Sequence, residues 1–370
     1  MKMRKIVCSF MISVVCFMTA ISGVSATSYD TSKINAAYSK VVEYYKNNNN
    51  LNNADKILAV ESLGLEAESN QFDTSSANLS STSLSKKIVT EVLLGVDPTE
   101  DKKTLESQID ENGNVEGSWG ASSDVWTLYA LYVTSSEKTN LIANKLNDEL
   151  AASSVCGYEW GGTYYADYDT TGWVIEGLAV VNKEKYATTI NKAIDYIKNN
   201  TTMTTTGWVT ADNVDTQSQV LEGMFAYDTN SLLNDRYTIH PIDCLLNTQL
   251  SDGSFPSGYN AEYTTAEVAK TLGTYKNGSV FEKAKKAYDK MMNPEQPDNT
   301  KPAQPTDTKK DSQSTNKVET TNQKTTSVKT GDETNVVIFV SLSMVSGGLF
   351  LVLRKEYESC LLYTSPSPRD

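Results

Sequence analysis

Histidine and cysteine are scarce in this chain, and their scarcity limits the chemistry that it can carry. There is one histidine, His240, and of the five cysteines only Cys156 and Cys244 lie in the central part of the sequence. A structural zinc site takes four Cys or His ligands, and a Ser-His-Asp triad needs a histidine base. We therefore expect no metal site and no cofactor, and we interpret His240, at a predicted helix start, as a capping or packing residue. The two cysteines either form one disulfide or remain two buried thiols.

Basic residues are also in the minority, which restricts the partners. The chain has 33 Lys and Arg against 46 Asp and Glu, a formal net charge of −13. Nucleic acids and anionic membrane surfaces bind basic patches, so neither is expected as a partner. The alternating apolar–polar pattern that would predict strands is likewise missing from the central part of the chain.

The first 26 residues have the order of a secretory signal peptide. Basic residues precede an apolar run over residues 6–21, and small residues follow up to Ala26. This order predicts cleavage after Ala26 and export of the rest, so residues 1–26 are left out of the fold.

The composition changes abruptly after residue 293. Residues 294–326 are mainly Pro, Thr, Gln, Lys, Asp and Ser, and a stretch with so little apolar content is expected to form a disordered, extended linker. Residues 327–359 contain an 18-residue apolar run, 336–353, which is long enough to cross a bilayer. Residues 360–370 fit nothing before them and resemble a translated sequencing adapter, so we interpret them as an artefact.

The order of features in residues 327–359 resembles a Gram-positive sortase sorting signal: a short motif, a hydrophobic segment and a basic tail. The resemblance implies cleavage between Thr330 and Gly331 and attachment of Thr330 to peptidoglycan. Ser327 and Val328 stand where the commonest motif has Leu and Pro, which leaves the class of sortase open. A plain C-terminal membrane anchor is the alternative, and either arrangement places residues 27–293 outside the cell.

Residues 27–293 contain a repeated pattern in which a glycine–aromatic loop and a short polar stretch lead into an apolar helix. A small residue or Thr recurs in these helices every 46 to 48 residues, at Ala130, Gly177, Gly223 and Thr271. Amphipathic segments between the copies have the spacing of second helices. A fixed period of this length indicates a repeat architecture of helical hairpins. We expect residues 31–46 and 53–66 to form a first hairpin, and residues 83–95 an outer helix. The glycine–aromatic loops are Gly117-Ser118-Trp119, Trp160-Gly161-Gly162, Gly207-Trp208 and Gly253-Ser254-Phe255.

The stretch from Gln249 to Phe255 resembles the Q…G-x-W/F motif of squalene–hopene cyclases and protein prenyltransferase β-subunits, and the stretch from Gln108 to Trp119 resembles a looser copy. The cobalamin carriers have the same toroid. The resemblance covers residues 28–293 and implies an all-α fold: an α/α toroid of five to six hairpins, with two concentric helix rings around a central cavity. The glycine–aromatic loops would be structural clasps, in which Gly permits the turn and the ring packs on the next hairpin.

The stretch from Asp167 to Gly172 resembles the Asp-x-Asp-Asp-Thr-Ala motif of class II terpene cyclases. Asp169 aligns with the proton-donating residue, but Thr170 replaces the last Asp. An acid that protonates an alkene needs a dry, hydrogen-bonded site, which a lost carboxyl partner puts in doubt. The structural alternative is that Asp167 or Asp169 caps its helix.

A second enzyme hypothesis is a glycosidase, which needs two carboxylates across a cavity. Glu61, Glu176 and Glu222 each precede a small residue of a predicted inner helix, and Tyr129 and Lys270 occupy that position in the other two repeats. The hypothesis that we favour is non-catalytic binding of a corrinoid, an isoprenoid, a glycan or another surface ligand. A rigid spacer or adhesin is the other possibility, and it predicts a cavity filled by side chains. Seven residues are expected to line the cavity: Tyr129, Tyr164, Tyr165, Tyr168, Glu176, Glu222 and Tyr263.

Overall fold

The computed structural model describes residues 28–68, 79–160, 163–208, 213–235 and 237–294. The chain divides into two units, residues 1–299 and 300–370, and every described residue belongs to the first. The expected signal peptide with Ala26, the linker, and the sorting signal with Thr330, Gly331 and the apolar run therefore lie outside the described residues.

The described residues form eleven helices and one short hairpin, which confirms the predicted all-α class. The hairpin, β1–β2, was not predicted; it is antiparallel and pairs Gly157 with Ala166 and Trp160 with Thr163. The elements are α2 (Thr31–Asn47), α3 (Ala54–Ser62), α4 (Ser81–Leu93), α5 (Thr99–Ser107), α6 (Ala121–Val133), α7 (Thr139–Ser153), β1 (Gly157–Trp160), β2 (Thr163–Ala166), α8 (Tyr168–Asn200), α9 (Val214–Asn234), α10 (Pro241–Leu246), α11 (Ala261–Asn277) and α12 (Val280–Met292).

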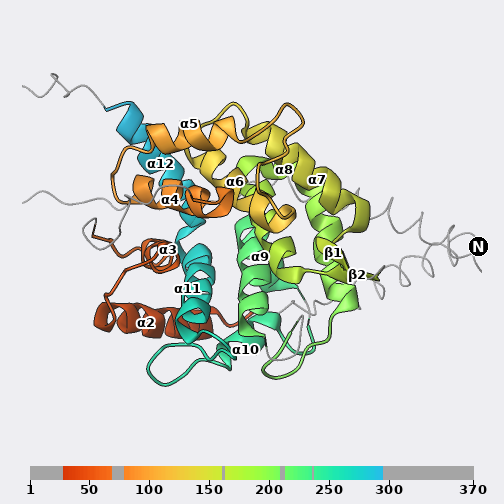
Figure 1. Cartoon of the computed structure of the whole chain (residues 1–370). Coiled ribbons are helices and arrows are strands. Elements are labelled where there is room, and N and C mark those ends of the chain that lie inside the picture. The colour runs from red at the N-terminus through yellow and green to blue at the C-terminus, as the bar shows by residue number, and fades with distance from the viewer. Residues whose placement is uncertain (1–27, 69–78, 161–162, 209–212, 236, 295–370) are drawn as a thin grey trace, which may run out of the picture. The chain divides into compact units, whose positions relative to one another are not determined.

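Six helices pack in an order that returns to its start. The order is α3, α4, α6, α8, α9 and α11, and α11 packs again on α3; α9 and α11 lie side by side near the middle of Figure 1. We call these six the central helices. They are buried over most of their surface: in α11 every residue from Thr264 to Thr274 is buried, whereas α5 buries only Leu105. A helix buried all round belongs to the core, and a helix with one buried stripe covers it.

Two of the central helices continue directly into outer ones. The backbone of α8 is extended at Asn182, and the backbone of α9 is extended at Asp228. Each long helix is therefore two helices joined by a kink. The central part of α8 ends before Asn182, and its outer part covers the amphipathic segment that the sequence predicts as a second helix.

The segment expected as an outer helix, residues 83–95, corresponds to α4, which is instead a central helix. It packs on α3, α6 and α12. Its polar residues misled the prediction because some of them bond within the helix and Lys87 pairs with α5. Ser85 and Thr90 donate to carbonyls four residues earlier, at 2.7 and 2.8 Å, and Lys87 pairs with Asp101 at 2.6 Å.

The expected clasps are confirmed in two loops and wrong in one. Trp208 and Phe255 are completely buried, whereas Trp119 is 83% exposed. Gly253 has φ +93°, and a Cβ there would overlap the carbonyl oxygen of Lys40 in α2, so the turn at this loop requires glycine. The buried indole near the start of α6 is that of Trp126, one and a half turns into the helix.

Helix α12 lies across the carboxyl ends of several central helices (Figure 1). Lys283 pairs with Glu61 at the end of α3 at 2.6 Å, and Asp289 accepts a hydrogen bond from Ser135, just beyond α6. At the start of α12, the ring of Phe281 stacks on Tyr129 with centroids 3.6 Å apart. This end of the central helices is therefore covered, and polar groups that face a ligand are to be sought at the opposite, amino-terminal end.

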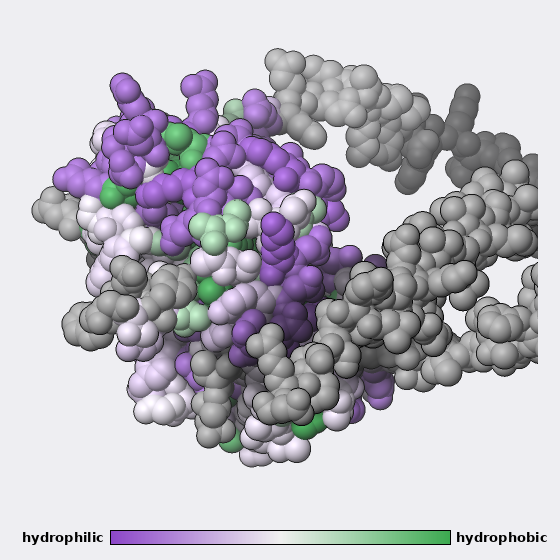
Figure 2. Space-filling model, turned by 90° about the vertical axis from the view of Figure 1, so that its right-hand side faces the viewer, coloured by the Kyte–Doolittle hydropathy of each residue, from purple (hydrophilic) through white to green (hydrophobic). Residues whose placement is uncertain are grey.

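The face drawn in Figure 2 has no large hydrophobic patch among the described residues. On the face drawn in Figure 2, hydrophilic side chains dominate the coloured area and hydrophobic ones form small separate patches. The large hydrophobic side chains that are exposed among the described residues are Trp119, Tyr165, Leu250, Tyr259 and Met292. Three of these, Trp119, Tyr165 and Tyr259, lie within a few residues of the start of a central helix.

Candidate binding site at the amino-terminal ends of the central helices

Three carboxylates occupy the same position on three central helices. Asp55, Asp169 and Asp215 are each the second residue of their helix, in α3, α8 and α9. A negative charge in the first turn is favoured by the helix dipole, which explains why aspartate is tolerated there. The hydroxyl of Tyr259 donates to Asp215, and Tyr263, in the first turn of α11, lies beside Tyr259 with ring centroids 6.3 Å apart. We call Asp55, Asp169, Asp215, Tyr259 and Tyr263 the mouth.

One turn deeper lies a second layer, which is polar and aromatic. It comprises Lys86, Trp126, Trp173, Gln219 and Glu267, about 6 Å further along the helices at 1.5 Å per residue. Lys86 pairs with Asp55 at 2.8 Å and stands 4.3 Å over the ring of Trp126. The rings of Trp126 and Trp173 meet at 5.8 Å. The amide of Gln219 donates to Glu267 at 3.1 Å, so neighbouring helices are connected around the layer.

A third layer is fully buried and carries charge. Lys270 of α11 lies 3.1 Å from Glu267 and 3.7 Å from Glu222 of α9. On the other side, Glu176 accepts hydrogen bonds from Tyr129 at 3.2 Å and from Ser279 at 2.7 Å.

The side chains of this layer meet in the middle of the six helices. The ammonium of Lys270 lies 5.6 Å from the ring centroid of Trp126 on α6. Because α6 and α11 are three steps apart in the packing order in either direction, this contact bridges opposite sides. The space between the helices at this depth is therefore occupied by side chains, as the spacer alternative also predicts.

Several buried oxygen atoms near the mouth have no hydrogen-bond partner among the described residues. They are Asp215 Oδ1, Gln219 Oε1 and Glu267 Oε1, and the indole N–H of Trp173 is also unpartnered. A buried acceptor without a donor is costly, by about 1–3 kcal/mol. Such a group is usually satisfied by water or by a ligand. Three unpartnered acceptors in one region are therefore the strongest sign of a binding site in the described part of the chain.

Burial changes the protonation of these acids. It raises the pKa of Asp169 to about 6, with a hydrogen bond from Thr216 opposing the shift and Asp167 and Asp215 adding to it. It also raises the pKa of Glu176 to about 6, against the hydrogen bond from Ser279, and raises the pKa of Glu222 well above its usual range. Burial alone would lower the pKa of Lys270, but the nearby Glu222, Glu267 and Glu176 together raise it. Lys270 is thus charged, and its ammonium is the counter-charge for Glu222, Glu267 and Glu176.

We expect the domain to become more stable as the pH falls from 7.5 to 5. Burial raises the pKa of Asp169 and of Glu176 to about 6 and that of Glu91 to about 7. These three acids therefore bind protons in the folded chain at a pH where the unfolded chain has lost them. Stability then falls as pH rises through the folded pKa values. One pKa unit corresponds to about 1.4 kcal/mol, so a gain of at least about 1 kcal/mol is expected at pH 5. Urea unfolding at both pH values measures it.

The exposed carboxyls do not interfere in that window. Hydrogen bonds from Thr99 and Ser254 lower the pKa of Asp97 and of Asp252, so their contribution is lost only when the pH falls below about 4. Equal stability at pH 5 and pH 7.5 would contradict the raised pKa values.

The structure brings some of the predicted site residues together and leaves others apart. Tyr129, Glu176 and Glu222 lie in the third layer, and Asp169 and Tyr263 lie at the mouth. Asp167 is the N-cap of α8 and accepts from the backbone N–H of Thr170 at 3.1 Å, which confirms the structural alternative for that residue. The remaining tyrosines lie beside α8: Tyr168 is its first residue and half-buried, Tyr165 is exposed in β2, and Tyr164 pairs with Glu159 in the hairpin.

Asp124, in the first turn of α6, does not cap its helix. The N-cap of α6 is Gly120, without a side-chain hydrogen bond. Asp124 is buried instead, accepting from Ser118 at 2.6 Å and pairing with Lys145 at 2.8 Å. Asn213 and Asn260 cap α9 and α11, so the capping residue precedes the aspartate or tyrosine in these copies.

Sequence reasoning missed the second layer, although the sequence contains a signal for it. Asp169, Trp173 and Glu176 have i, i+4, i+7 spacing, and so do Asp215, Gln219 and Glu222, and again Tyr263, Glu267 and Lys270. Each set keeps the repeat distance of 46 and then 48 residues. Residues at this spacing share one face of a helix, so the column of Tyr129, Glu176, Glu222 and Lys270 identifies the two layers above it.

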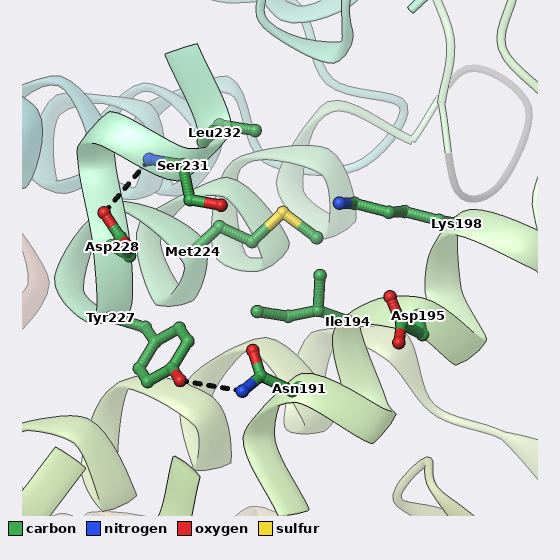
Figure 3. A pocket seen from close by; sticks show the side chains of 9 residues that line it. All are labelled: Asn191, Ile194, Asp195, Lys198, Met224, Tyr227, Asp228, Ser231 and Leu232. Carbon is green, nitrogen blue, oxygen red and sulfur yellow. Dashed lines mark hydrogen bonds between the residues drawn. The ribbon is translucent and has the colours of Figure 1, made fainter. Parts of the chain in front are cut away.

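A separate cavity of about 160 Å³ lies between the outer part of α8 and α9 (Figure 3). The side chains of Ile194 and Met224 point toward each other across it, and the hydroxyl of Tyr227 accepts a hydrogen bond from Asn191 at 3.0 Å. The one lysine on its wall, Lys198, is paired with Asp235. None of the predicted site residues lines it.

The remaining chemical candidates are accounted for by local structure. His240 is the N-cap of α10, and its Nδ1 accepts from the backbone N–H of Ile242 at 3.3 Å, which confirms the capping interpretation. Cys156 and Cys244 are two free, buried thiols. In the described ranges, no three His, Cys, Asp or Glu side chains converge closely enough to hold a metal ion. Within the same ranges, no helix combines the length and apolar character needed to cross a bilayer.

Comparison of the chain with protein-family models, with curated proteins and with solved structures finds no match.

Proposed function

We propose that residues 28–293 form an α/α toroid that is displayed outside the cell and binds a ligand at the mouth without catalysis. The closed packing order of the six central helices supports the toroid. Export and attachment to peptidoglycan through Thr330, or to the membrane through residues 336–353, rest on the sequence features at the two ends.

The observation that carries the binding function is the convergence of polar groups from all six central helices below an end that exposes aromatic rings. Tyr259 is 71% exposed, its hydroxyl is bonded to the carboxylate of Asp215, and Asp215 Oδ1 has no partner in the described chain. Half-buried aromatic faces with a few fixed polar groups are typical of ligand sites. The buried third layer gives such a site a rigid floor.

Binding is favoured over cyclase-like catalysis by the hydrogen bond that Thr170 makes. Its hydroxyl donates to Asp167 at 2.6 Å, so the residue that replaces the motif's last Asp takes part in the helix cap rather than supporting Asp169. Asp169 retains the raised pKa of a general acid, which keeps catalysis as the second candidate.

Native mass spectrometry of the purified full chain tests the proposal. We expect an adduct to survive desalting after exposure to one of three probes: a corrinoid, an isoprenyl alcohol or a soluble peptidoglycan fragment. Tyr263→Ala should abolish it, because the ring belongs to the mouth, and Tyr227→Ala should keep it, because that half-buried tyrosine lies on the cavity of Figure 3.

Two other outcomes would overturn the proposal. An adduct that survives Tyr263→Ala and is lost in Tyr227→Ala would move the site to the outer cavity. A changed probe mass that disappears in Asp169→Asn would show turnover and establish the enzyme hypothesis.

A further inference from the structure

The acids of the three layers outnumber the lysines and are not all neutralised by them. The acids are Asp55, Asp169, Glu176, Asp215, Glu222 and Glu267, and the lysines are Lys86 and Lys270. Lys86 is paired with Asp55 at 2.8 Å, and Lys270 is paired with Glu267 at 3.1 Å. Asp169 and Asp215, on neighbouring helices, have no lysine within ion-pair distance in the described chain.

Three of the buried unpartnered groups in these layers, on Asp215, Gln219 and Glu267, are acceptors as placed, and the fourth is the indole N–H of Trp173, a donor. Asp215 is 3% exposed, and its other oxygen accepts from Tyr259, so its side chain is held in place beside the mouth. Acceptors held without donors are complementary to a group that only donates, and an ammonium is such a group.

From these observations we infer that the ligand of the mouth carries a primary ammonium group, which binds between the carboxylates of Asp169 and Asp215 against the rings of Trp173 and Tyr263. This inference rests on the proposed binding function. The rings contribute because an aromatic face attracts a cation. A neutral ligand would leave both carboxylates without a counter-charge. A metal ion is disfavoured because no three ligating side chains converge in the described residues.

The dipoles of the helices act against a cation, but their effect is limited in depth. Each amino terminus carries about half a positive charge, and its influence fades within the first turn. Asp55, Asp169 and Asp215 stand in that first turn and offset it, while Glu267 and Glu222 lie one and two turns deeper. The net potential at the level of Trp173 is therefore set by the excess of carboxylates.

Calorimetric titration of the full chain with two matched pairs of probes tests the inference. The pairs are butylamine against 1-butanol, and glucosamine against N-acetylglucosamine, at pH 7.5 and low salt. A charge-assisted hydrogen bond contributes about 1.5–3 kcal/mol, so we expect each amine to bind at least about tenfold more tightly than its neutral partner. Asp215→Asn should remove about tenfold of the affinity for butylamine. Asp148→Asn, which changes an exposed aspartate on α7, should leave it unchanged.

The outcomes separate this inference from the proposed function. Equal binding of both members of a pair, lost in Tyr263→Ala, would overturn the ammonium and leave the binding site. Amine binding that is unchanged in Asp215→Asn would place the ammonium elsewhere, and no binding of either amine would also overturn the inference. The comparison of the pairs needs only the unaltered chain, so it decides the question even if Asp215→Asn fails to fold.

Discussion

Replacing Lys270 by methionine should lower the free energy of unfolding by about 3–5 kcal/mol at pH 7.5, which is the range for breaking a buried ion pair by removing one partner. Methionine keeps the length and the apolar stem but removes the only ammonium between Glu222 and Glu267, which lie 3.7 and 3.1 Å away. Both carboxylates would then be buried without a counter-charge. Urea unfolding of the full chain, followed by circular dichroism, measures the loss.

The matched control is Lys103→Met on α5. Lys103 also pairs with a glutamate, Glu100, at 2.7 Å, but its side chain is 64% exposed, and an exposed pair contributes only about 0–1 kcal/mol. Part of the loss in Lys270→Met should be recovered at pH 5, because the pKa of Glu222 is already raised by burial and its protonated form needs no partner. A loss no greater than that of Lys103→Met would show that the third layer does not depend on its charge.

The sequence predicts the repeat and the equivalent positions of the glutamates within it because both depend on local periodicity. Small residues at Gly177 and Gly223 and the glutamates before them recur at one distance, and the structure places both glutamates at the same depth. A period fixes which face of each helix is shared, and with it the depth of a side chain along the bundle.

The sequence does not predict which helix partners which, because that depends on contacts between distant residues. The amphipathic appearance of α4 suggested an outer helix, yet its serine and threonine satisfy themselves within the helix and let it enter the core. The cross-bundle approach of Lys270 to Trp126 joins residues 144 positions apart. Neither the closed order of packing nor this contact can be predicted from the local sequence pattern.

The residues of the mouth are only partly predictable from the sequence. For Asp167 and Asp169 the sequence allows a helix cap or a catalytic motif, and the structure separates the two residues. Asp167 caps α8, while Asp169 and Asp215 are the second residues of their helices and lie at the mouth. This distinction depends on where the helix starts, which a sequence locates only to within a few residues. An error of two residues in the predicted start exchanges the capping position for a position inside the helix.

The proposed binding site and the core share residues, so stability and binding are coupled in this protein. Glu267 contacts Gln219 of the second layer and Lys270 of the third. A change at Lys270 should therefore alter the position of Gln219 and the polarity below Asp215. Variants of the mouth are expected to change binding with little change in stability, and variants of the third layer are expected to change both.

Replacing Gly223 by alanine should destabilise the domain by about 2 kcal/mol or more, although alanine is the better helix former by about 1 kcal/mol. The Cβ added at Gly223 would overlap the backbone carbonyl oxygen of Gly172, and one added at Gly172 would overlap that of Gln219. The obstacle is backbone on both sides, so no side chain can move away, and α8 and α9 must separate. Overpacking of this kind typically costs about 1–3 kcal/mol and sometimes more.

The control for this variant is Gly258→Ala, because the added Cβ meets nothing within 4 Å. We expect its urea midpoint to stay within error of the unaltered chain or to rise slightly, since alanine restricts the unfolded chain. Separation of α8 from α9 would also move Asp169 away from Asp215, so Gly223→Ala should weaken butylamine binding at a urea concentration where the protein is still folded. A Gly223→Ala midpoint equal to that of Gly258→Ala would mean that the two central helices do not pack backbone to backbone, and the order of packing on which the toroid rests would have to be revised.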